Sequence, residues 1–182
     1  MSTFKRIVGL LVAVSAMCTG ALATAGQAQA AGVSWGELRF MTGNRTVCLD
    51  AGAAGTAPVV WGCNGNNYQL WKFTRVSGAS WYKTYNVESI QFPGRCLDGW
   101  PNNSGPNGMT RLTMYACNGG WKQQQWKASV QTGGGGWLWL QNAYTNQCID
   151  MWGSRTSWGT PIVTYGCRFK VDNQAFRYTA GL

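Results

Sequence analysis

The chain has 182 residues, 25 of them glycine and 11 of them tryptophan, and its formal net charge is +9. It contains no histidine, which excludes Ser-His-Asp and Cys-His catalytic sites and metals bound by histidine. A length of this order is typical of one domain.

The N-terminal segment has the pattern of a secretory signal. Lys5 and Arg6 precede an almost wholly apolar run over residues 7–17, and Ala28-Gln29-Ala30 places small residues where a signal peptidase cuts. The apolar run is too short to cross a bilayer. We therefore expect cleavage after residue 30, secretion of residues 31–182 to the extracellular space, and no membrane insertion. The secreted part would carry 13 basic and 6 acidic residues, because Lys5 and Arg6 are the charged residues of the leader.

Short apolar runs follow one another along the rest of the chain, and no window shows a helical stripe. The runs are typical of strands in length and composition and cover residues 37–41, 59–61, 112–115, 137–140 and 162–165. Turn residues separate them, at Gly52, Pro93-Gly94, 101–108 and 133–136. This pattern predicts an all-β, closed or pseudo-symmetric architecture.

Three motifs recur in the same order three times: a Cys-aliphatic-Asp triplet, an aromatic residue two positions before a second cysteine, and a Gln-x-aromatic triplet. The aspartates of the triplets, Asp50, Asp98 and Asp150, lie 48 and 52 residues apart. A fixed period of about fifty residues indicates one structural unit repeated three times. Approximate unit boundaries are 33–78, 79–130 and 131–182.

Six of the seven cysteines fall two to each unit, and an even number in a secreted chain is typical of disulfides. The repeat favours one pairing, in which the partners are Cys48 with Cys63, Cys96 with Cys117, and Cys148 with Cys167. Zinc binding is disfavoured by the lack of both histidine and any Cys-x-x-Cys pair. We expect neither a metal nor another cofactor.

Together, these motifs resemble those of the ricin B-type lectins and related β-trefoil carbohydrate-binding modules. The resemblance covers essentially all of residues 31–182, and it implies a β-trefoil with three lobes around a pseudo-threefold axis. It also implies that the Gln-x-aromatic rings, Trp71, Trp126 and Phe176, are structural. The preceding glutamines, Gln69, Gln124 and Gln174, would mainly satisfy backbone groups, with a secondary contact to ligand.

The resemblance also implies a sugar-binding role for particular residues. The aspartates would accept sugar hydroxyls, and the rings two positions before the second cysteine would stack on the sugar; these rings are Trp61, Tyr115 and Tyr165. A ligand-binding asparagine of the family matches Asn173 in the third unit. Gln123 occupies that place in the second unit, and Asn67 lies one step from it in the first. The third unit is therefore the best preserved and the first the least.

The physical chemistry of these residue types agrees with a sugar ligand. A pyranose has an apolar C–H face, which an aromatic ring can cover, and a rim of hydroxyls, which a carboxylate can accept. The same residues also suit structural roles. Asp is a common turn residue, and an aromatic ring in a strand can face the core. Further tryptophans follow the triplets and could either wall a pocket or fill the barrel: Trp100, Trp152 and Trp158.

Other functions fit less well. A glycosidase needs two carboxylates flanking one bond, whereas three of the six acids recur in separate units, so we expect no enzyme activity. Nucleic-acid binding is disfavoured because the basic residues are scattered and we expect the chain to be secreted. The sequence thus predicts a secreted lectin for galactosyl, xylosyl or other glycans, acting alone or with a separately encoded enzyme or toxin subunit. The alternative is a non-catalytic trefoil that binds a protein, as a toxin-targeting subunit or a protease inhibitor does.

Overall fold

The structure is a computed structural model that describes residues 33–42, 46–77, 82–102, 104–130, 137–168, 171–180 and 182. The expected secretory signal, residues 1–30, lies outside the described residues. Within them the chain forms strands and one-turn 3-10 helices, and no α-helix. None of these helical turns has the length or the apolar character that a membrane span requires.

The strands follow the three sequence units. The first unit contains β1 (Val33–Phe40), β2 (Val47–Asp50), β3 (Val59–Gly62) and β4 (Leu70–Ser77). The second contains β5 (Lys83–Ser89), β6 (Arg95–Asp98), β7 (Thr110–Arg111), β8 (Thr113–Ala116) and β9 (Gln125–Val130). The third contains β10 (Leu138–Asn142), β11 (Gln147–Met151), β12 (Ile162–Gly166) and β13 (Phe176–Tyr178). The 3-10 helices are Asn67–Gln69, Pro106–Gly108, Lys122–Gln124 and Trp152–Ser154.

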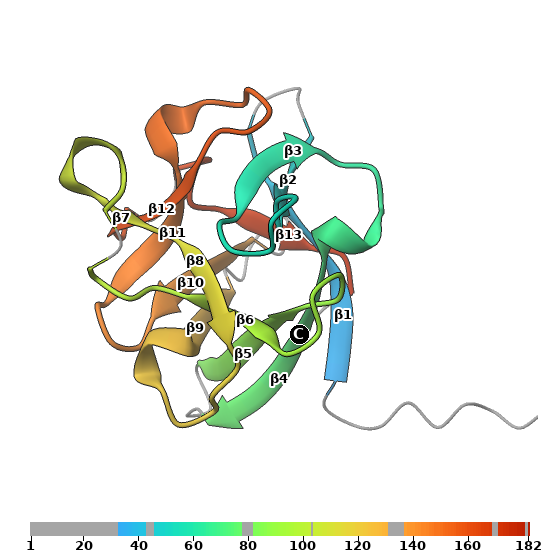
Figure 1. The fold of residues 1–182 in the computed structure, drawn as a ribbon, viewed down its shortest axis with the longest axis vertical. Coiled ribbons are helices and arrows are strands. Elements are labelled where there is room, and N and C mark those ends of the chain that lie inside the picture. Colours follow the sequence, from blue (N-terminus) through green and yellow to red (C-terminus); the bar gives the residue numbers. More distant parts are fainter. Residues whose placement is uncertain are drawn as a thin grey trace, which may run out of the picture.

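Six strands, two from each unit, pair in a closed ring. Their order is β1, β4, β5, β9, β10 and β13, and β13 pairs back to β1. Figure 1 shows β1 and β13 side by side, although they lie near opposite ends of the described chain. Closure of this kind removes the free sheet edges that could otherwise pair with other chains.

Six of the other strands form one hairpin in each unit, with the same register, and β7 pairs with β12 of the third unit. Cys48 lies opposite Trp61, Cys96 opposite Tyr115, and Cys148 opposite Tyr165. Successive side chains in a strand point to opposite faces, so the aspartate two residues after each first cysteine shares a face with the ring. The aliphatic residue between the cysteine and the aspartate points to the opposite face and is fully buried; it is Leu49, Leu97 or Ile149.

The core is built around the aromatic residues of the Gln-x-aromatic triplets. Trp71, Trp126 and Phe176 have no exposed surface. The indole N–H of Trp71 donates to the carbonyl of Leu49 at 3.0 Å, and that of Trp126 to the carbonyl of Leu97 at 3.1 Å. Buried tryptophans usually find such a partner, because an unpaired N–H would be costly. The expected structural role of these rings is confirmed.

Each hairpin is bordered by a neighbouring unit. The amide of Met114 donates to the carbonyl of Thr56 at 2.8 Å, and that of Leu112 donates to the carbonyl of Ile162 at 3.0 Å. The amide of Val60 donates to the carbonyl of Thr160 at 2.9 Å, which brings the third unit back onto the first. The contacts therefore run cyclically around the molecule, and residues of one unit can enter the site of the next.

The disulfides join Cys48 to Cys63, Cys96 to Cys117 and Cys148 to Cys167. This is the pairing that the repeat favoured, one bridge within each unit. The prediction of an all-β trefoil with three pseudo-symmetric units and one disulfide in each is confirmed.

Candidate functional site

The three units place the aspartate and the glutamine of their motifs in the same arrangement. Each aspartate is nearly or fully buried, and its Oδ2 accepts a hydrogen bond from the glutamine Nε2. The distances are 3.1 Å for Asp50–Gln69, 3.0 Å for Asp98–Gln124 and 2.7 Å for Asp150–Gln174. A buried carboxylate is stable only when its oxygens are paired, and the glutamine supplies one of those partners.

The same glutamine also holds the strand that carries the ring. Its Nε2 donates to the carbonyl of the residue after the ring, at 2.9 Å for Gly62, 3.0 Å for Ala116 and 3.1 Å for Gly166. Its Oε1 accepts from the backbone amide of the residue after the second cysteine: Asn64, Asn118 or Arg168. The glutamines have no exposed surface. Gln174, a predicted sugar contact, therefore lies beneath Asp150 and orients that carboxylate.

The second unit forms a pocket of about 520 Å³. It is lined by Asp98, Trp100, Thr113, Tyr115, Trp121 and Gln123. The Tyr115 ring is 58% exposed, and the Trp121 ring lies 6.2 Å from it at an interplanar angle of 26°. Three rings and one carboxylate thus share one open cavity. The predicted residues Asp98, Tyr115 and Gln123 all line it, and Trp121 is an additional wall that sequence reasoning missed.

Three hydrogen bonds hold residues that line this second-unit pocket. Asp98 accepts a hydrogen bond from the amide of Trp100 at 2.9 Å. The carboxylate therefore also stabilises a turn, which is the structural role that the sequence left as an alternative. The carbonyl of Gln123 accepts from the Gly99 amide at 2.9 Å and from the Asn142 side chain at 2.7 Å. The pocket walls are therefore tied to the barrel before any ligand binds.

In the third unit, three predicted residues come together around one carboxylate. Asp150 accepts from Asn173 at 2.8 Å through Oδ1 and from Gln174 at 2.7 Å through Oδ2. Tyr165 is 44% exposed on the same face of the hairpin. A further residue, Arg168, enters the site: its Nη2 lies 3.4 Å from Asp150 Oδ2, and its guanidinium lies 5.2 Å from the Tyr165 ring centroid.

Sequence reasoning missed Arg168, although a signal was present. Arg168 directly follows the second cysteine of its unit, where the other units have Asn64 and Asn118. The backbone amide has the same partner in all three, the buried glutamine. The third unit alone has a long cationic side chain at this position, and that side chain reaches the carboxylate.

Burial raises the pKa of Asp150 above its usual 3.8, while hydrogen bonds from Gln174 and Asn173 and the charge of Arg168 oppose the rise. The pKa of the folded state therefore lies above that of the unfolded chain. The folded protein then holds this proton more tightly, so Asp150 lowers the free energy of unfolding as pH rises from below 3.8 through the folded-state pKa.

Replacing Arg168 with glutamine should raise the pKa of Asp150 further, because it removes the nearby positive charge that favours the ionised form. The carboxyl-carbon NMR shift of Asp150, followed against pH in both proteins, measures this change. Arg177→Gln, on the exposed part of β13, is the matched control for loss of one charge. An Asp150 pKa that is the same in all three proteins would mean that Arg168 does not act on this carboxylate in solution.

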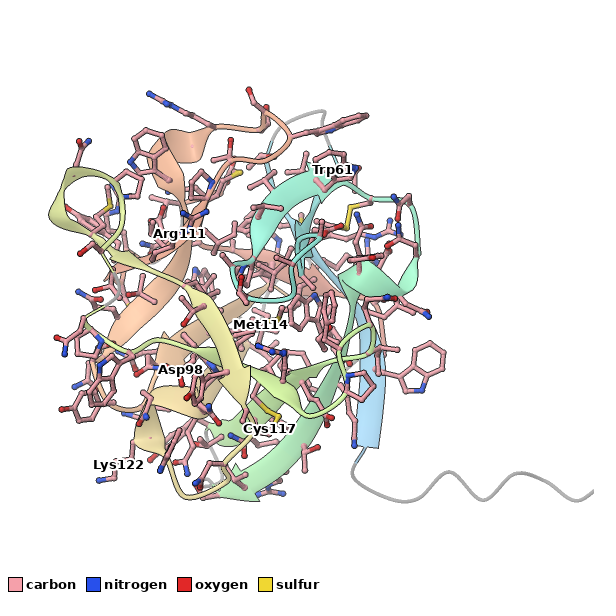
Figure 2. The ribbon with its side chains drawn as sticks, viewed as in Figure 1. Trp61, Asp98, Arg111, Met114, Cys117 and Lys122 are labelled. Carbon is pink, nitrogen blue, oxygen red and sulfur yellow. A yellow bond between two sulfur atoms is a disulfide. The ribbon has the colours of Figure 1, made fainter. Side chains whose placement is uncertain are left out.

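The first unit has the same core, but its ring is partly covered. Asp50 accepts from the Gly52 amide at 2.9 Å and from Gln69. Trp61 stacks on Trp158, a third-unit residue, with centroids 5.0 Å apart and an interplanar angle of 27°. Asn67 is exposed and begins the 3-10 helix whose cap is Asn66. Figure 2 shows Trp61 and Asp98 in different lobes, so the first and second sites are separate surfaces.

The described residues contain no group of three or more His, Cys, Asp or Glu side chains that could hold a metal ion. The carboxylates of the three sites are instead paired with amide donors of the chain, as the hydrogen bonds to Gln69, Gln124 and Gln174 show. Each site offers a carboxylate edge beside an aromatic face, which is an arrangement suited to a ligand with both hydroxyls and an apolar surface.

Comparison with known proteins agrees with this architecture. Residues 82–165 match the family described as ricin-type beta-trefoil lectin domain-like. No curated protein matches the chain.

Several solved structures share the fold. The designed threefold-symmetric protein ThreeFoil is 22% identical with a TM-score of 0.62, over 81% of this chain and 99% of that one. The Macrolepiota procera ricin B-like lectin, solved with lactose, is 15% identical with a TM-score of 0.54, over 78% and 93%. The hemolytic lectin CEL-III is 22% identical with a TM-score of 0.58, over 81% of this chain and 31% of that one, so this chain spans about a third of its length.

Identities this low show a shared fold, and the family match adds the lectin-type sequence pattern across the second unit and most of the third. Residues 82–165 thus match the ricin-type β-trefoil lectin-like family, and the chain as a whole is similar in fold to solved β-trefoil proteins.

Proposed function

We propose that the protein is a secreted lectin that binds carbohydrate through its Asp-aromatic pockets, without a metal and without catalysis. The observation that carries the proposal is the second-unit pocket, where the Asp98 carboxylate faces an open cavity walled by Tyr115 and Trp121. The match of residues 82–165 to a lectin-type family supports carbohydrate as the ligand class. The three disulfides support secretion, since such bridges persist in oxidising compartments.

The second-unit pocket suits a neutral sugar. The exposed Tyr115 ring would cover the apolar face of a pyranose, and Asp98 would accept its hydroxyl protons. Gln123, which can both donate and accept, would read the orientation of a hydroxyl. Because Gln124 and the Trp100 amide already hold Asp98, the ligand meets a carboxylate that is oriented in advance.

We propose the corresponding residues of the other units as further, differently modified pockets. In the third these are Asp150, Tyr165 and Asn173, with Gln174 as a positioning residue; in the first they are Asp50, Trp61 and Asn67. The sequence favoured the third pocket. The geometry favours the second for neutral sugars, because Arg168 enters the third and Trp158 covers part of the first. Single shallow sites bind weakly, and several on one scaffold raise avidity on a multivalent surface.

A glycan array with the oxidised protein, run with and without EDTA, tests the proposal. We expect binding to a class of neutral glycans, galactosyl or xylosyl ones among the candidates, that EDTA leaves unchanged. Loss of binding in EDTA would contradict metal independence. A folded sample that binds no glycan would contradict the lectin proposal and favour a trefoil that binds a protein partner, such as a separately encoded toxin subunit.

An accessory role beside an enzyme is consistent with this proposal. The exo-beta-1,3-galactanase 1,3Gal43A from Clostridium thermocellum contains a region of the same fold, which corresponds to 30% of that chain. By that analogy the present chain would bring a separately encoded catalytic protein to its polysaccharide. In this role the protein would bind the polysaccharide and would break no bond in it.

A further inference from the structure

The candidate site of the third unit differs from the second-unit pocket in the charge beside its aromatic rings. Tyr165 corresponds to Tyr115 and Trp152 to Trp100, the ring two residues after the aspartate. The Arg168 guanidinium lies 5.2 Å from the Tyr165 centroid, and that of Arg155 lies 4.0 Å from the Trp152 centroid. An arginine guanidinium therefore lies over each of these two rings, Tyr165 and Trp152, whose counterparts line the second-unit pocket.

Arg168 is held by a contact that a ligand could replace. Its Nη2 lies 3.4 Å from Asp150 Oδ2, a long single hydrogen bond, and its side chain is 53% exposed. A guanidinium has five N–H donors, and among the described residues no acceptor other than Asp150 is hydrogen-bonded to it. Carboxylates and sulfates bind this group through two parallel hydrogen bonds, which is a stronger arrangement.

Asp150 would stay paired if Arg168 turned toward a ligand. Asn173 donates to one of its oxygens at 2.8 Å and Gln174 to the other at 2.7 Å, and both donors are themselves buried. Breaking a buried ion pair is usually costly because it leaves a buried charge without a partner. If Arg168 moves, the Asp150 carboxylate still has its two hydrogen-bond donors. We therefore expect Arg168 to leave Asp150 without disturbing the two donors that hold this carboxylate.

We propose that the third-unit pocket selects acidic saccharides, and that Arg168 recognises the ligand's carboxylate or sulfate while Tyr165 covers its apolar face. The proposal rests on the function proposed above and gives the third pocket a ligand class of its own. Arg155, on the neighbouring Trp152 ring, adds a second positive charge near the site. The net positive charge of the chain favours the approach of anionic polymers.

The test compares two probes that differ in charge and hardly in shape: trigalacturonic acid and its methyl ester. Titration of the oxidised, isotope-labelled protein, followed by backbone NMR, detects binding even at millimolar affinity. We expect Arg168→Gln to weaken trigalacturonate binding about tenfold or more, because a charge-assisted hydrogen bond is lost, and to change ester binding by about twofold or less. Galactose 6-sulfate, run in parallel, distinguishes sulfate from carboxylate as the preferred anion.

Matched variants separate recognition from general electrostatics. Arg177→Gln removes an equal charge from the exposed part of β13 and should leave trigalacturonate affinity unchanged. Arg168→Lys keeps the charge and loses the planar fork, so we expect an intermediate affinity. If Arg168→Gln binds trigalacturonate and the sulfate like the parent, the inference is wrong. It is also wrong if that variant gains affinity for the ester, since Arg168 would then be a plug in a neutral-sugar site.

The lectin proposal and this inference can fail separately. Binding of neutral glycans through Tyr115, with no Arg168-dependent binding of either anion, would leave the lectin and overturn the acidic pocket. Arg168-dependent binding of trigalacturonate, with no neutral glycan bound by any variant, would support the acidic pocket and overturn the neutral-sugar role of the second unit.

Discussion

Replacing Tyr115 with alanine is expected to weaken binding of the neutral glycan found by the array between about tenfold and a hundredfold. The ring is 58% exposed and lines the second-unit pocket, so it is free to cover an apolar sugar face. Removing that aromatic surface forfeits about 1.5–3 kcal/mol of apolar burial. Since shallow lectin sites begin near millimolar affinity, at about −4 kcal/mol, such a loss raises the dissociation constant of this pocket to about 10 mM or more.

The control for Tyr115→Ala is Trp35→Ala on β1. Trp35 is 60% exposed and is not among the residues that line the pocket, so its loss removes comparable aromatic surface elsewhere. Titration calorimetry or NMR with the same glycan measures both variants. Trp61→Ala should also have the smaller effect, because Trp158 already stacks on that ring. Equal binding by the Tyr115 variant and the parent would remove the second-unit pocket as the main site.

Replacing Trp126 with alanine is expected to lower the free energy of unfolding by about 4 kcal/mol. The ring has no exposed surface, and its indole N–H donates to the carbonyl of Leu97 at 3.1 Å. The substitution therefore leaves a large cavity at the barrel centre and a buried carbonyl without its donor. A loss of this size is a large fraction of the stability of a single domain.

Guanidinium denaturation of the oxidised protein measures the Trp126 effect. Trp158→Ala is the matched control, since Trp158 is 66% exposed and its principal neighbour is the Trp61 ring. That control should cost about 1 kcal/mol or less, the size of an aromatic pair. If the two variants lose similar stability, the central role of the Gln-x-aromatic rings is contradicted.

Much of the fold and part of the site could be predicted because they depend on local spacing. The paired cysteines, the Gln-x-aromatic triplets and the strand-like runs all lie within single units, and each unit folds them in the same register. Asp98 and Tyr115 were brought together by that register, since Cys96 pairs with Tyr115 and the aspartate shares its face. Gln124 could also be placed in the second unit from its repeated motif. Its hydrogen bond to Asp98 became visible only in the three-dimensional structure.

Residues that act across units, or through the direction of a long side chain, could not be predicted in this way. Trp158 lies almost a hundred residues from Trp61, and only closure of the barrel places the two rings in contact. The chain has eleven tryptophans, and nothing in the sequence singled out Trp121 as a pocket residue. The structure shows its ring stacked near that of Tyr115. The sequence shows that Arg168 is a cationic residue. Only the structure shows that its side chain extends over the Tyr165 ring to Asp150 and so belongs to the site.

The sequence by itself determined the repeated unit and favoured the disulfide pairing, and its resemblance to a known family predicted the trefoil and the candidate ligand residues of each unit. The repeat and the pairing follow from local periodicity, because strand alternation and loop length act over a few residues and recur in each unit. The tertiary structure decided how the three sites differ: the second is open, the first is partly covered by Trp158, and the third holds Arg168. The physical reason is that packing between units and the choice of side-chain direction depend on the whole closed barrel, which no local pattern encodes.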